Sequence, residues 1–283
     1  MTSAATALLS LVLGSTIGCS GSIAAVPSVA ATLERSAQLP IPAPAVQEPQ
    51  VEHVATSVQG REIYAYRIGS GSSSVRLVLI GQMHGNEPAG AEIVDELIST
   101  SHAQESADRR GTDSRGNGSN GIDIWLIPTL NPDGRTARSR VNSHGVDLNR
   151  NFPTSWRRAG KGTSQWSGSA PASEPEVQGL ISFLRQINPT AVVVLHQDYA
   201  VVDLSHPRSR VAGRRLADLL GLPARPVGCS GKCHGTLTEW VDQDLAAIAL
   251  TVELPGRVSG RQVLRYANAL LDFATWLARP PAH

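Results

Sequence analysis

Two residues in the first third of the chain, His84 and Glu87, could bind a metal ion. They lie three positions apart, where the apolar run 75–80 gives way to a helical pattern that begins near Pro88. An imidazole nitrogen and a carboxylate oxygen at this spacing can face one point in space, as zinc requires of two of its ligands. A polar pair at a strand end is more often a solvated turn. The prediction therefore depends on residues further along the chain.

His196 supplies a third candidate ligand directly after the apolar run 191–195. A lone His at a strand end is more often structural, but with His84 and Glu87 it completes a His-Glu-His set. Three protein ligands that leave a fourth position open for water are typical of a catalytic zinc site, where the pKa of the water falls toward about 7. We therefore predict one zinc ion per chain.

Glu253 could act as a general base, since it follows the apolar run 245–252. A carboxylate buried there without a partner would cost several kcal/mol, so it must be exposed, hydrogen-bonded or functional. We predict that it takes a proton from the attacking water and passes it to the leaving nitrogen. The alternative is an ordinary glutamate on the surface at the end of a strand.

The polar segment 138–153 holds the remaining candidates. Asp147 could accept the second ring N–H of His84 and so fix its orientation. Arg150 with Asn149 offers a guanidinium and an amide suited to a carboxylate, and Arg140 could hold a developing oxyanion. An exposed Arg-rich loop, with an Asp that caps a turn, is the alternative interpretation.

The elements that must position these side chains follow from hydrophobic periodicity. Alternating or continuous apolar residues predict strands at 62–68, 75–80, 122–127, 191–195, 201–204 and 245–252. Helical spacing predicts helices at 88–98, 174–187, 208–220 and 259–277. Residues 101–121, rich in polar side chains and Gly, predict a surface loop or insert. Strands that alternate with helices predict an α/β fold, a three-layer α/β/α domain around a central mixed β-sheet.

Composition limits the class of partner. The chain has 283 residues, 41% of them hydrophobic, which is enough for a large buried core. Its net charge of +1 argues against a surface built for nucleic acid or an anionic membrane. We expect a small molecule or peptide as partner, and a monomer or weak dimer.

The N-terminal segment 1–19 has no charged side chain. It contains an apolar core at 4–13 and ends at Cys19. This segment is too short to span a bilayer, and it predicts a secretory signal or, with a lipidated Cys19, a lipoprotein signal. Because no Lys or Arg precedes the apolar core, an unstructured tail is the alternative. Residues 20–50 predict a flexible linker, and 51–283 the catalytic domain. We expect export to the periplasm or cell envelope, with a lipid anchor as the sole membrane contact, or a cytoplasmic location if the segment is not a signal.

Cys229 and Cys233 are close enough in sequence to close a small disulfide loop. Two free thiols, or a metal clip completed by His234, are the alternatives. A metal clip lacks a visible fourth ligand nearby, which favours the disulfide.

Taken together, these motifs resemble the zinc carboxypeptidase family over residues 54–277. The resemblance is carried by His84-x-x-Glu87, Asn131-Pro-Asp-Gly134, Arg140, the run Gly-Val-Asp-Leu-Asn-Arg-Asn-Phe at 145–152, His196 and Glu253. It implies zinc on His84, Glu87 and His196. It further implies Glu253 as base, Arg140 at the oxyanion, and Asn149 with Arg150 on the substrate's terminal carboxylate.

Within that family, the opening 57–62 and the ending 252–255 look most like murein peptide amidases, which implies cleavage of the γ-D-glutamyl to diaminopimelate bond in cell-wall peptides. Many carboxypeptidases carry a tyrosine on a loop before the catalytic glutamate, yet residues 200–265 contain none. This departure argues against general C-terminal trimming. Tyr199 is the candidate to line the pocket instead, with Lys232 and His234 at its rim.

Two other functions remain open. Enzymes of the succinylglutamate desuccinylase and aspartoacylase type share His-Gly-Asn-Glu and Asp-Leu-Asn-Arg, and would cleave an N-acylamino acid. Asn131-Pro-Asp-Gly134 favours the peptidase. A non-catalytic module that binds cell wall is the second alternative, but the three predicted ligands and Glu253 are all present.

Overall fold

The computed structural model describes residues 50–69, 73–109, 122–227 and 233–279. The predicted signal at 1–19 with Cys19, all but the last residue of the predicted linker, and the predictions for Cys229 and Lys232 lie outside these residues. The described strands are β1 (Val51–Thr56), β2 (Glu62–Ile68), β3 (Val75–Ile80), β4 (Ile122–Ile127), β5 (Ala191–Asp203), β6 (Ala224–Arg225) and β7 (Ile248–Pro255). The described helices are α1 (Ala89–Arg109), α2 (Pro132–Ala137), α3 (Pro175–Ile187), α4 (Arg210–Leu220), α5 (Leu237–Asp244) and α6 (Gly260–Leu277), with short 3-10 turns at Leu148–Arg150 and Pro207–Ser209.

The described strands form one mixed sheet, as predicted. The order along the sheet is β1-β2-β4-β3-β5-β6, and β7 also pairs with β5. β1, β2 and β4 pair antiparallel, whereas β4, β3 and β5 are parallel neighbours. Because parallel strands end at the same edge of a sheet, the loops after β3 and β4 meet there.

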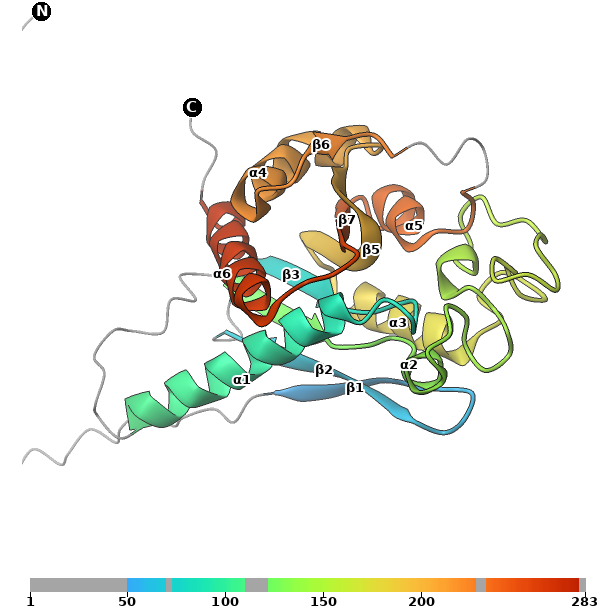
Figure 1. Ribbon diagram of the computed structural model, residues 1–283, viewed down its shortest axis with the longest axis horizontal. Helices are drawn as coiled ribbons and strands as arrows, with labels where there is room; N and C mark the ends of the chain where they lie inside the picture. The colour runs from blue at the N-terminus through green and yellow to red at the C-terminus, as the bar shows by residue number, and fades with distance from the viewer. Residues whose placement is uncertain (1–49, 70–72, 110–121, 228–232, 280–283) are drawn as a thin grey trace, which may run out of the picture. The chain divides into compact units, whose positions relative to one another are not determined.

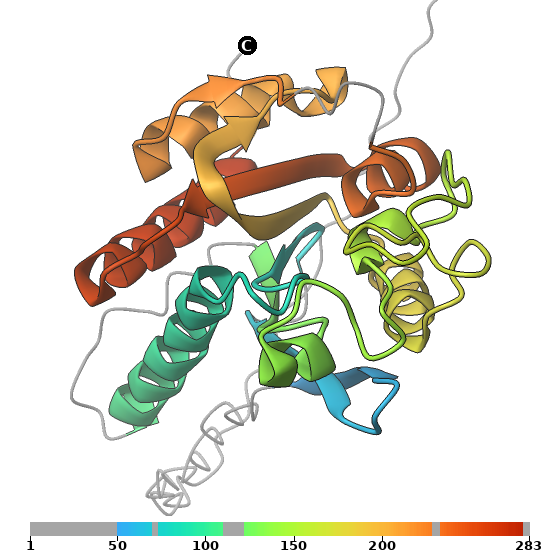
Figure 2. The same ribbon diagram turned by 45° about the vertical axis from the view of Figure 1, so that its right-hand side comes forward.

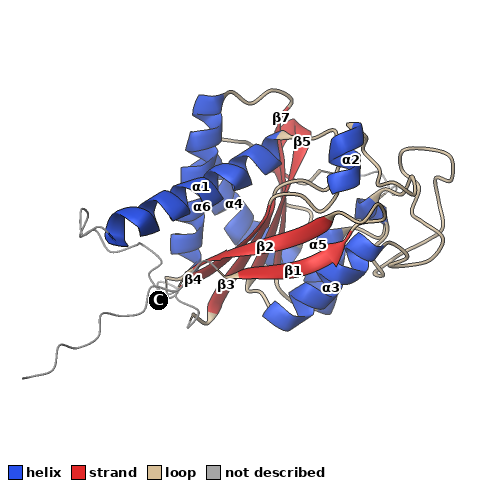
Figure 3. Ribbon diagram, turned by 90° about the horizontal axis from the view of Figure 1, so that it is seen from below, coloured by secondary structure: helices blue, strands red, loops and turns tan. Residues whose placement is uncertain are grey.

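Helices cover both faces of the sheet, which confirms the three-layer α/β/α architecture. α1, α4 and α6 lie on one face, and α3 and α5 on the other (Figures 1 and 3). Alternation along β3 explains both cores, since Leu77 and Leu79 pack toward the first group while Val78 and Ile80 pack toward the second. No described helix is both long and apolar enough to cross a bilayer.

β5 differs from its prediction, because the two short strands expected at 191–195 and 201–204 are the halves of one bent strand. The first half runs parallel to β7, from Ala191 beside Ile248 to His196 beside Glu253. After a bend the partners run back along β7, and Val201 also lies beside Glu253. Ala200, with φ of 51°, occupies the left-handed region at this bend. β5, gold in Figure 2, therefore curves around β7.

Two further boundaries correct the predictions. α1 continues to Arg109, so the loop predicted at 101–121 is wrong for its first nine residues. The segment 101–109 contains no Gly or Pro and several good helix formers, which lets the helix propagate. β7 begins at Ile248 rather than at residue 245, because the unpredicted helix α5 runs to Asp244 and residues 245–247 connect it to the strand. The predicted helices at 174–187 and 259–277 are confirmed, each beginning one residue later.

Candidate active site

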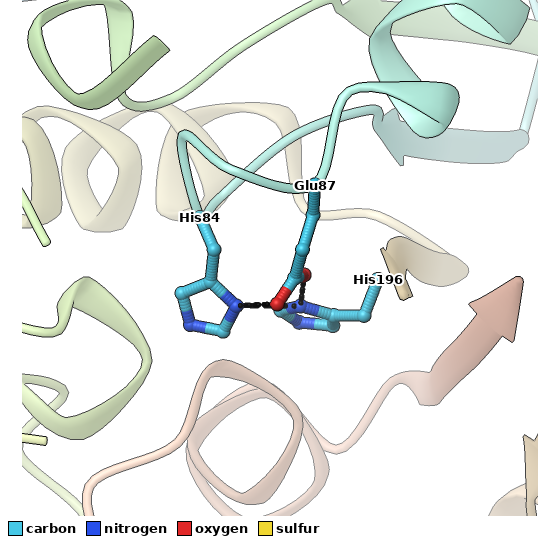
Figure 4. A group of neighbouring side chains, drawn as sticks. All are labelled: His84, Glu87 and His196. Atoms are coloured by element: carbon cyan, nitrogen blue, oxygen red, sulfur yellow. Dashed lines mark hydrogen bonds and ion pairs between the residues drawn. The ribbon is translucent and has the colours of Figure 1, made fainter. Parts of the chain in front are cut away.

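His84, Glu87 and His196 converge on one point, as predicted. His84 and Glu87 lie in the loop between β3 and α1, and His196 lies in β5, two residues beyond the position that pairs with the last residue of β3. The Nδ1 of His84 is 2.8 Å from one Glu87 oxygen, and the Nδ1 of His196 is 2.9 Å from the other. The two Nδ1 atoms are 3.1 Å apart (Figure 4). All three side chains are buried.

This donor set fits a zinc ion. The Nε2–H of His84 donates to the Asp147 carboxylate at 3.0 Å, so the Nδ1 of the neutral ring is a lone-pair acceptor. It then faces a carboxylate oxygen that is also an acceptor, and the space between them requires a proton or a cation. Two imidazole nitrogens and a carboxylate are ligands that zinc prefers. His84, Glu87 and His196 are the residues that would hold it, with all three donor atoms within 4.8 Å of one another.

The pKa values of His84 and Glu87 reflect how close the ligand side chains lie to one another. Burial alone would lower the pKa of His84, but Asp147 and Glu87 raise it above its ordinary value. Burial would raise the pKa of the Glu87 carboxyl, but hydrogen bonds from His196 and His84 hold it well below its usual range. In the metal-free chain the two carboxylates therefore favour the charged form of His84, as a cation at the same position would be favoured.

Asp147 connects His84 to Arg140, and its predicted contact with the His84 ring is present. Its second oxygen accepts from Arg140 Nε at 3.0 Å and forms an ion pair with Nη2 at 2.9 Å. Arg140 Nη1 also donates to Glu87 Oε1 at 3.3 Å. The guanidinium is thereby held against the metal-ligand set, and its side chain lines the cavity described below.

Asn131 fixes the two loops that carry these groups. Its amide donates to the carbonyl of Met83 at 3.2 Å and to that of Arg140 at 3.3 Å, and its oxygen accepts from Gly134 N at 2.8 Å. At Gly85 a Cβ would lie 1.9 Å from the carbonyl carbon of Gly134, so only glycine permits this approach. In the sequence, Asn131-Pro-Asp-Gly134 is recognisable as a family motif, but nothing in its residue types or spacing predicts this positioning role.

Asp133 of the same motif holds the turn between β1 and β2. It accepts from Ser57 Oγ at 2.9 Å and from Gln59 N at 3.0 Å, and it forms an ion pair with Arg61. The motif thus ties the β1–β2 hairpin to the loops around the metal-ligand set.

Glu253 lies within β7 rather than after it, beside His196. Its Oε2 is buried and has no hydrogen-bond partner, and the side chain lines the cavity. Burial and the nearby Glu87 carboxylate raise its pKa to about 7. An unpartnered carboxyl beside a metal-ligand set is suited to accepting and releasing a proton.

Asn149 and Arg150 follow Asp147 on the short turn Leu148–Arg150. Asn149 Oδ1 accepts from Leu237 N at 3.0 Å, which directs its Nδ2 to within 3.3 Å of His196 Nε2. Arg150 Nη1 donates to the Asn149 carbonyl at 2.7 Å, and its buried Nε has no partner. Both side chains line the cavity, with guanidinium N–H groups free for an anion.

One cavity of about 1090 Å³ is lined by the three metal-ligand candidates and by Arg140, Asn149, Arg150 and Glu253. Tyr199 lines this cavity, as predicted, and is 66% exposed. Several lining residues were not predicted, because they belong to no motif and look like ordinary surface residues in sequence. They are Asp198, Asp203, His206, Arg225, Glu239 and Asp242.

Cys233 lines the same cavity and is disulfide-bonded, which rules out the free-thiol and metal-clip alternatives for this residue. The pairing with Cys229 stays a prediction, since Cys229 lies outside the described residues. His234 does not line the cavity. It is buried, and its Nδ1 has no hydrogen-bond partner, so the rim position predicted for it is wrong.

Comparison with known proteins gives three sequence findings. Residues 46–210 match the model of the zinc carboxypeptidase family. Murein peptide amidase A of Escherichia coli K12 is 27% identical over 241 residues, which cover 81% of this chain and 90% of that protein. Carboxypeptidase D of Homo sapiens is 29% identical over 161 residues, which cover 52% of this chain and 11% of that protein.

Solved structures agree with these matches. The murein-tripeptide amidase of Escherichia coli O157 superposes with a TM-score of 0.62 at 25% identity, covering 83% of this chain and 94% of that one. Carboxypeptidase A of Helicoverpa armigera superposes with a TM-score of 0.67 at 17% identity, covering 81% and 68%, and shares the fold.

Proposed function

The chain belongs to the zinc carboxypeptidase family, and from this premise we propose that it hydrolyses the amide bond between γ-D-glutamate and diaminopimelate in murein-derived peptides. The chain is a metal-dependent hydrolase of this family. The observation that carries the proposed bond is the similarity to murein peptide amidase A, which extends over 81% of the chain and 90% of that relative.

The ligand set defines the chemistry of the site. When held by His84, Glu87 and His196, a zinc ion supplies Lewis acidity, which polarises a carbonyl and lowers the pKa of water. Asp147 keeps the Nδ1 of His84 directed at that point by accepting its Nε2–H.

Glu253 serves as the general base in this proposal. Its unpartnered Oε2 accepts a proton from the attacking water and returns it to the leaving nitrogen, so that the amine departs neutral. Arg140 is anchored by Asp147 and Glu87, and its remaining N–H groups donate to the oxygen that becomes negative as the carbonyl is attacked.

Asn149 and Arg150 bind the free α-carboxylate of the residue that is released. The support is the orphaned Nε of Arg150, a buried donor that a carboxylate would satisfy. Such a clamp positions the adjacent amide bond beside Glu253, because both groups line the same cavity.

The proposed bond is tested by mass spectrometry of products after the zinc-loaded full chain is incubated with L-Ala-γ-D-Glu-diaminopimelate. An ordinary peptide with a free C-terminus and an N-acylamino acid are incubated in parallel. We expect free diaminopimelate, and its loss when a chelator is added. Release of an ordinary C-terminal residue alone would make the chain a general carboxypeptidase. Turnover of the N-acylamino acid alone would favour the aspartoacylase type.

The site of action follows as part of the same proposal. We propose that the chain acts in the periplasm or cell envelope, supported by the uncharged apolar segment before Cys19. Fractionation of cells that express the full chain, with labelled palmitate and a Cys19→Ala variant, would separate an anchored, an exported and a cytoplasmic form.

A further inference from the structure

The cavity extends beyond the metal-ligand set to two residues of opposite charge, Asp203 of β5 and Arg225 of β6. The two are register partners on adjacent strands, next to Val202 and Ala224. Val202 and Ala224 pack into the core shared with α4 and α6. Because side chains alternate along a strand, Asp203 and Arg225 project to the opposite face, and both line the cavity.

The bend of β5 brings this pair close to Glu253. Glu253 lies beside Val201, and Val252 beside Val202, so Asp203 lies one step further along β7, level with Thr251. Two residues along a strand span about 7 Å. Thr251 also lines the cavity, which is therefore continuous from Glu253 to this pair.

Neither charge is neutralised by the other. Asp203 Oδ1 accepts from Ser205 N, Ser205 Oγ and Val227 N, whereas no described residue donates to Oδ2. Within the described part of the chain, the Arg225 guanidinium has no hydrogen-bond or ion-pair partner, and its side chain is exposed to the cavity. An anion and a cation therefore lie side by side, and each has hydrogen-bonding atoms that no described residue contacts.

Two other acidic residues of the cavity, Glu239 and Asp242, contact neighbouring side chains. Glu239 accepts from Ser155 Oγ at 2.6 Å. Asp242 forms an ion pair with Arg208 Nε at 3.4 Å and lies 3.8 Å from His206 Nδ1. Asp203 and Arg225 differ from the other charged residues of the cavity because they are register partners, which places an unused carboxylate oxygen next to a guanidinium without a described partner.

We propose that Asp203 and Arg225 bind a second amino-acid head group at the end of the released residue's side chain. Asp203 Oδ2 accepts from the distal ammonium, and Arg225 donates to the distal carboxylate. This deepens the proposed function and rests on it, because diaminopimelate carries such a head group three methylenes from its first α-carbon. A neutral apolar side chain would leave both charges without a partner, which costs affinity.

The test compares C-terminal residues that lack one or both distal charges. L-Ala-γ-D-Glu peptides that end in diaminopimelate, lysine, 2-aminopimelate or norleucine are hydrolysed by wild type and variants. We expect wild type to prefer diaminopimelate to either singly charged residue, and norleucine to be the poorest substrate. Each charge-assisted hydrogen bond contributes about tenfold or more in kcat/KM.

Each variant should change one ratio. Arg225→Gln should lower the diaminopimelate to lysine ratio of kcat/KM by about tenfold or more, because lysine lacks the distal carboxylate. Asp203→Asn should lower the lysine to norleucine ratio similarly, because norleucine lacks the ammonium. Asn retains the oxygen that accepts from Ser205 and Val227, so the loop keeps its bonds. Arg225→Lys should recover part of the diaminopimelate preference, since a cation remains.

Matched controls are Arg214→Gln and Asp218→Asn, which remove the same charges from exposed positions of α4 outside the cavity. Both should retain the wild-type ratios. Circular dichroism of each variant checks that the fold is intact.

Calorimetry with free diaminopimelate and free lysine gives a readout that does not depend on turnover. Diaminopimelate that binds more tightly than lysine, with the difference lost in Arg225→Gln, would support the assignment. This holds even if no γ-D-glutamyl peptide is cleaved, and only the proposed bond would then be wrong. Cleavage of these peptides with ratios that Arg225→Gln and Asp203→Asn leave unchanged would overturn the assignment and leave the proposed bond standing.

Discussion

His84 is held from two sides by carboxylates, Asp147 at Nε2 and Glu87 at Nδ1. The two contacts differ in role, because only the Nδ1 side also faces a second imidazole, that of His196. Asp147 fixes the ring's proton, and the remaining lone pair points where a cation is needed. The charge of Asp147, and not its shape alone, should therefore determine how tightly the metal binds.

The variant Asp147→Asn tests whether the charge of Asp147 determines metal affinity. The amide keeps the oxygen that accepts from Asn149 N but removes the charge that pairs with His84 and Arg140. We expect zinc affinity to fall about 10- to 100-fold, measured by competition with a chromogenic chelator. Asp95→Asn, on the exposed surface of α1, is the control. Equal affinities in both variants would mean that Asp147 does not orient His84.

Glu253→Gln removes the proposed base without changing the volume of the side chain. We expect kcat to fall about 10²- to 10⁴-fold while zinc content stays at one ion per chain, measured by steady-state kinetics and elemental analysis. Glu92→Gln, on the exposed side of α1, should retain activity. A Glu253→Gln enzyme with near-normal turnover would remove Glu253 from the base role.

The pH dependence of the rate follows from the same carboxyl. Burial and Glu87 raise the pKa of Glu253 to about 7 in the metal-free chain. Its folded pKa exceeds the ordinary value of 4.5, so the metal-free protein should lose stability as pH rises through this interval. A cation beside Glu87 favours the anion and lowers this pKa.

The base must be deprotonated to act, so kcat/KM of the zinc enzyme should fall with decreasing pH, with its midpoint below 7. The pH profile of kcat/KM checks this, alongside a carbon-13 NMR titration of the metal-free chain with Glu253→Gln for assignment. A midpoint above that of the metal-free carboxyl would contradict the expectation that a cation lowers the pKa of Glu253.

At the scale of elements, the loop after β3 and the loop after β4 are joined through Asn131. Its amide satisfies the Met83 and Arg140 carbonyls at once, so it sets the distance between the ligand loop and the Arg140 segment. A buried carbonyl left without a donor costs about 1–3 kcal/mol. The positions of these loops depend on this side chain more than on their own local propensities.

Asn131→Ala should therefore destabilise the fold by about 2–4 kcal/mol and weaken zinc binding, because the His84 loop loses its anchor. Denaturant unfolding of the metal-free chain gives the first value, and a chelator competition gives the second. Asn268→Ala, on the exposed side of α6, should change neither. Destabilisation without any loss of zinc affinity would separate Asn131 from the site.

At the scale of the whole molecule, the site lies where the two cores and the bent strand meet. His196 is part of β5, which pairs with β3, β6 and β7, so the ligand set is connected to most of the sheet. A cation that joins His196 to the β3–α1 loop should stabilise the folded domain, because the unfolded chain cannot assemble the set.

Zinc at 100 times its dissociation constant should add about 2.7 kcal/mol and raise Tm by about 5–10 °C, and a chelator should reverse the rise. Differential scanning calorimetry of the chain with and without zinc measures both. The His196→Ala variant should give one Tm in both conditions. An equal rise in that variant would show that zinc stabilises the chain from elsewhere.

Much of the fold could be predicted because its signals are local. The nearly continuous apolar runs 75–80 and 122–127 predict strands covered on both faces, and the strand bounds agree with the structure. The ligand residues and Glu253 were predictable for a similar reason, since His84 and Glu87 are three apart and His196 and Glu253 follow apolar runs. Residue type and spacing along one strand or turn are properties of the chain itself.

Only the tertiary structure decided which distant residues share the cavity. The amino-acid sequence could not indicate that β5 bends around β7, which brings Asp203 level with Thr251 and beside Arg225. It also could not assign to Asn131 its contacts with Met83 and Arg140. Such contacts join segments far apart in the chain, and their energy depends on burial and register. Neither quantity is set by local hydrophobic periodicity, so charged residues outside a motif look like ordinary surface until the strands pair.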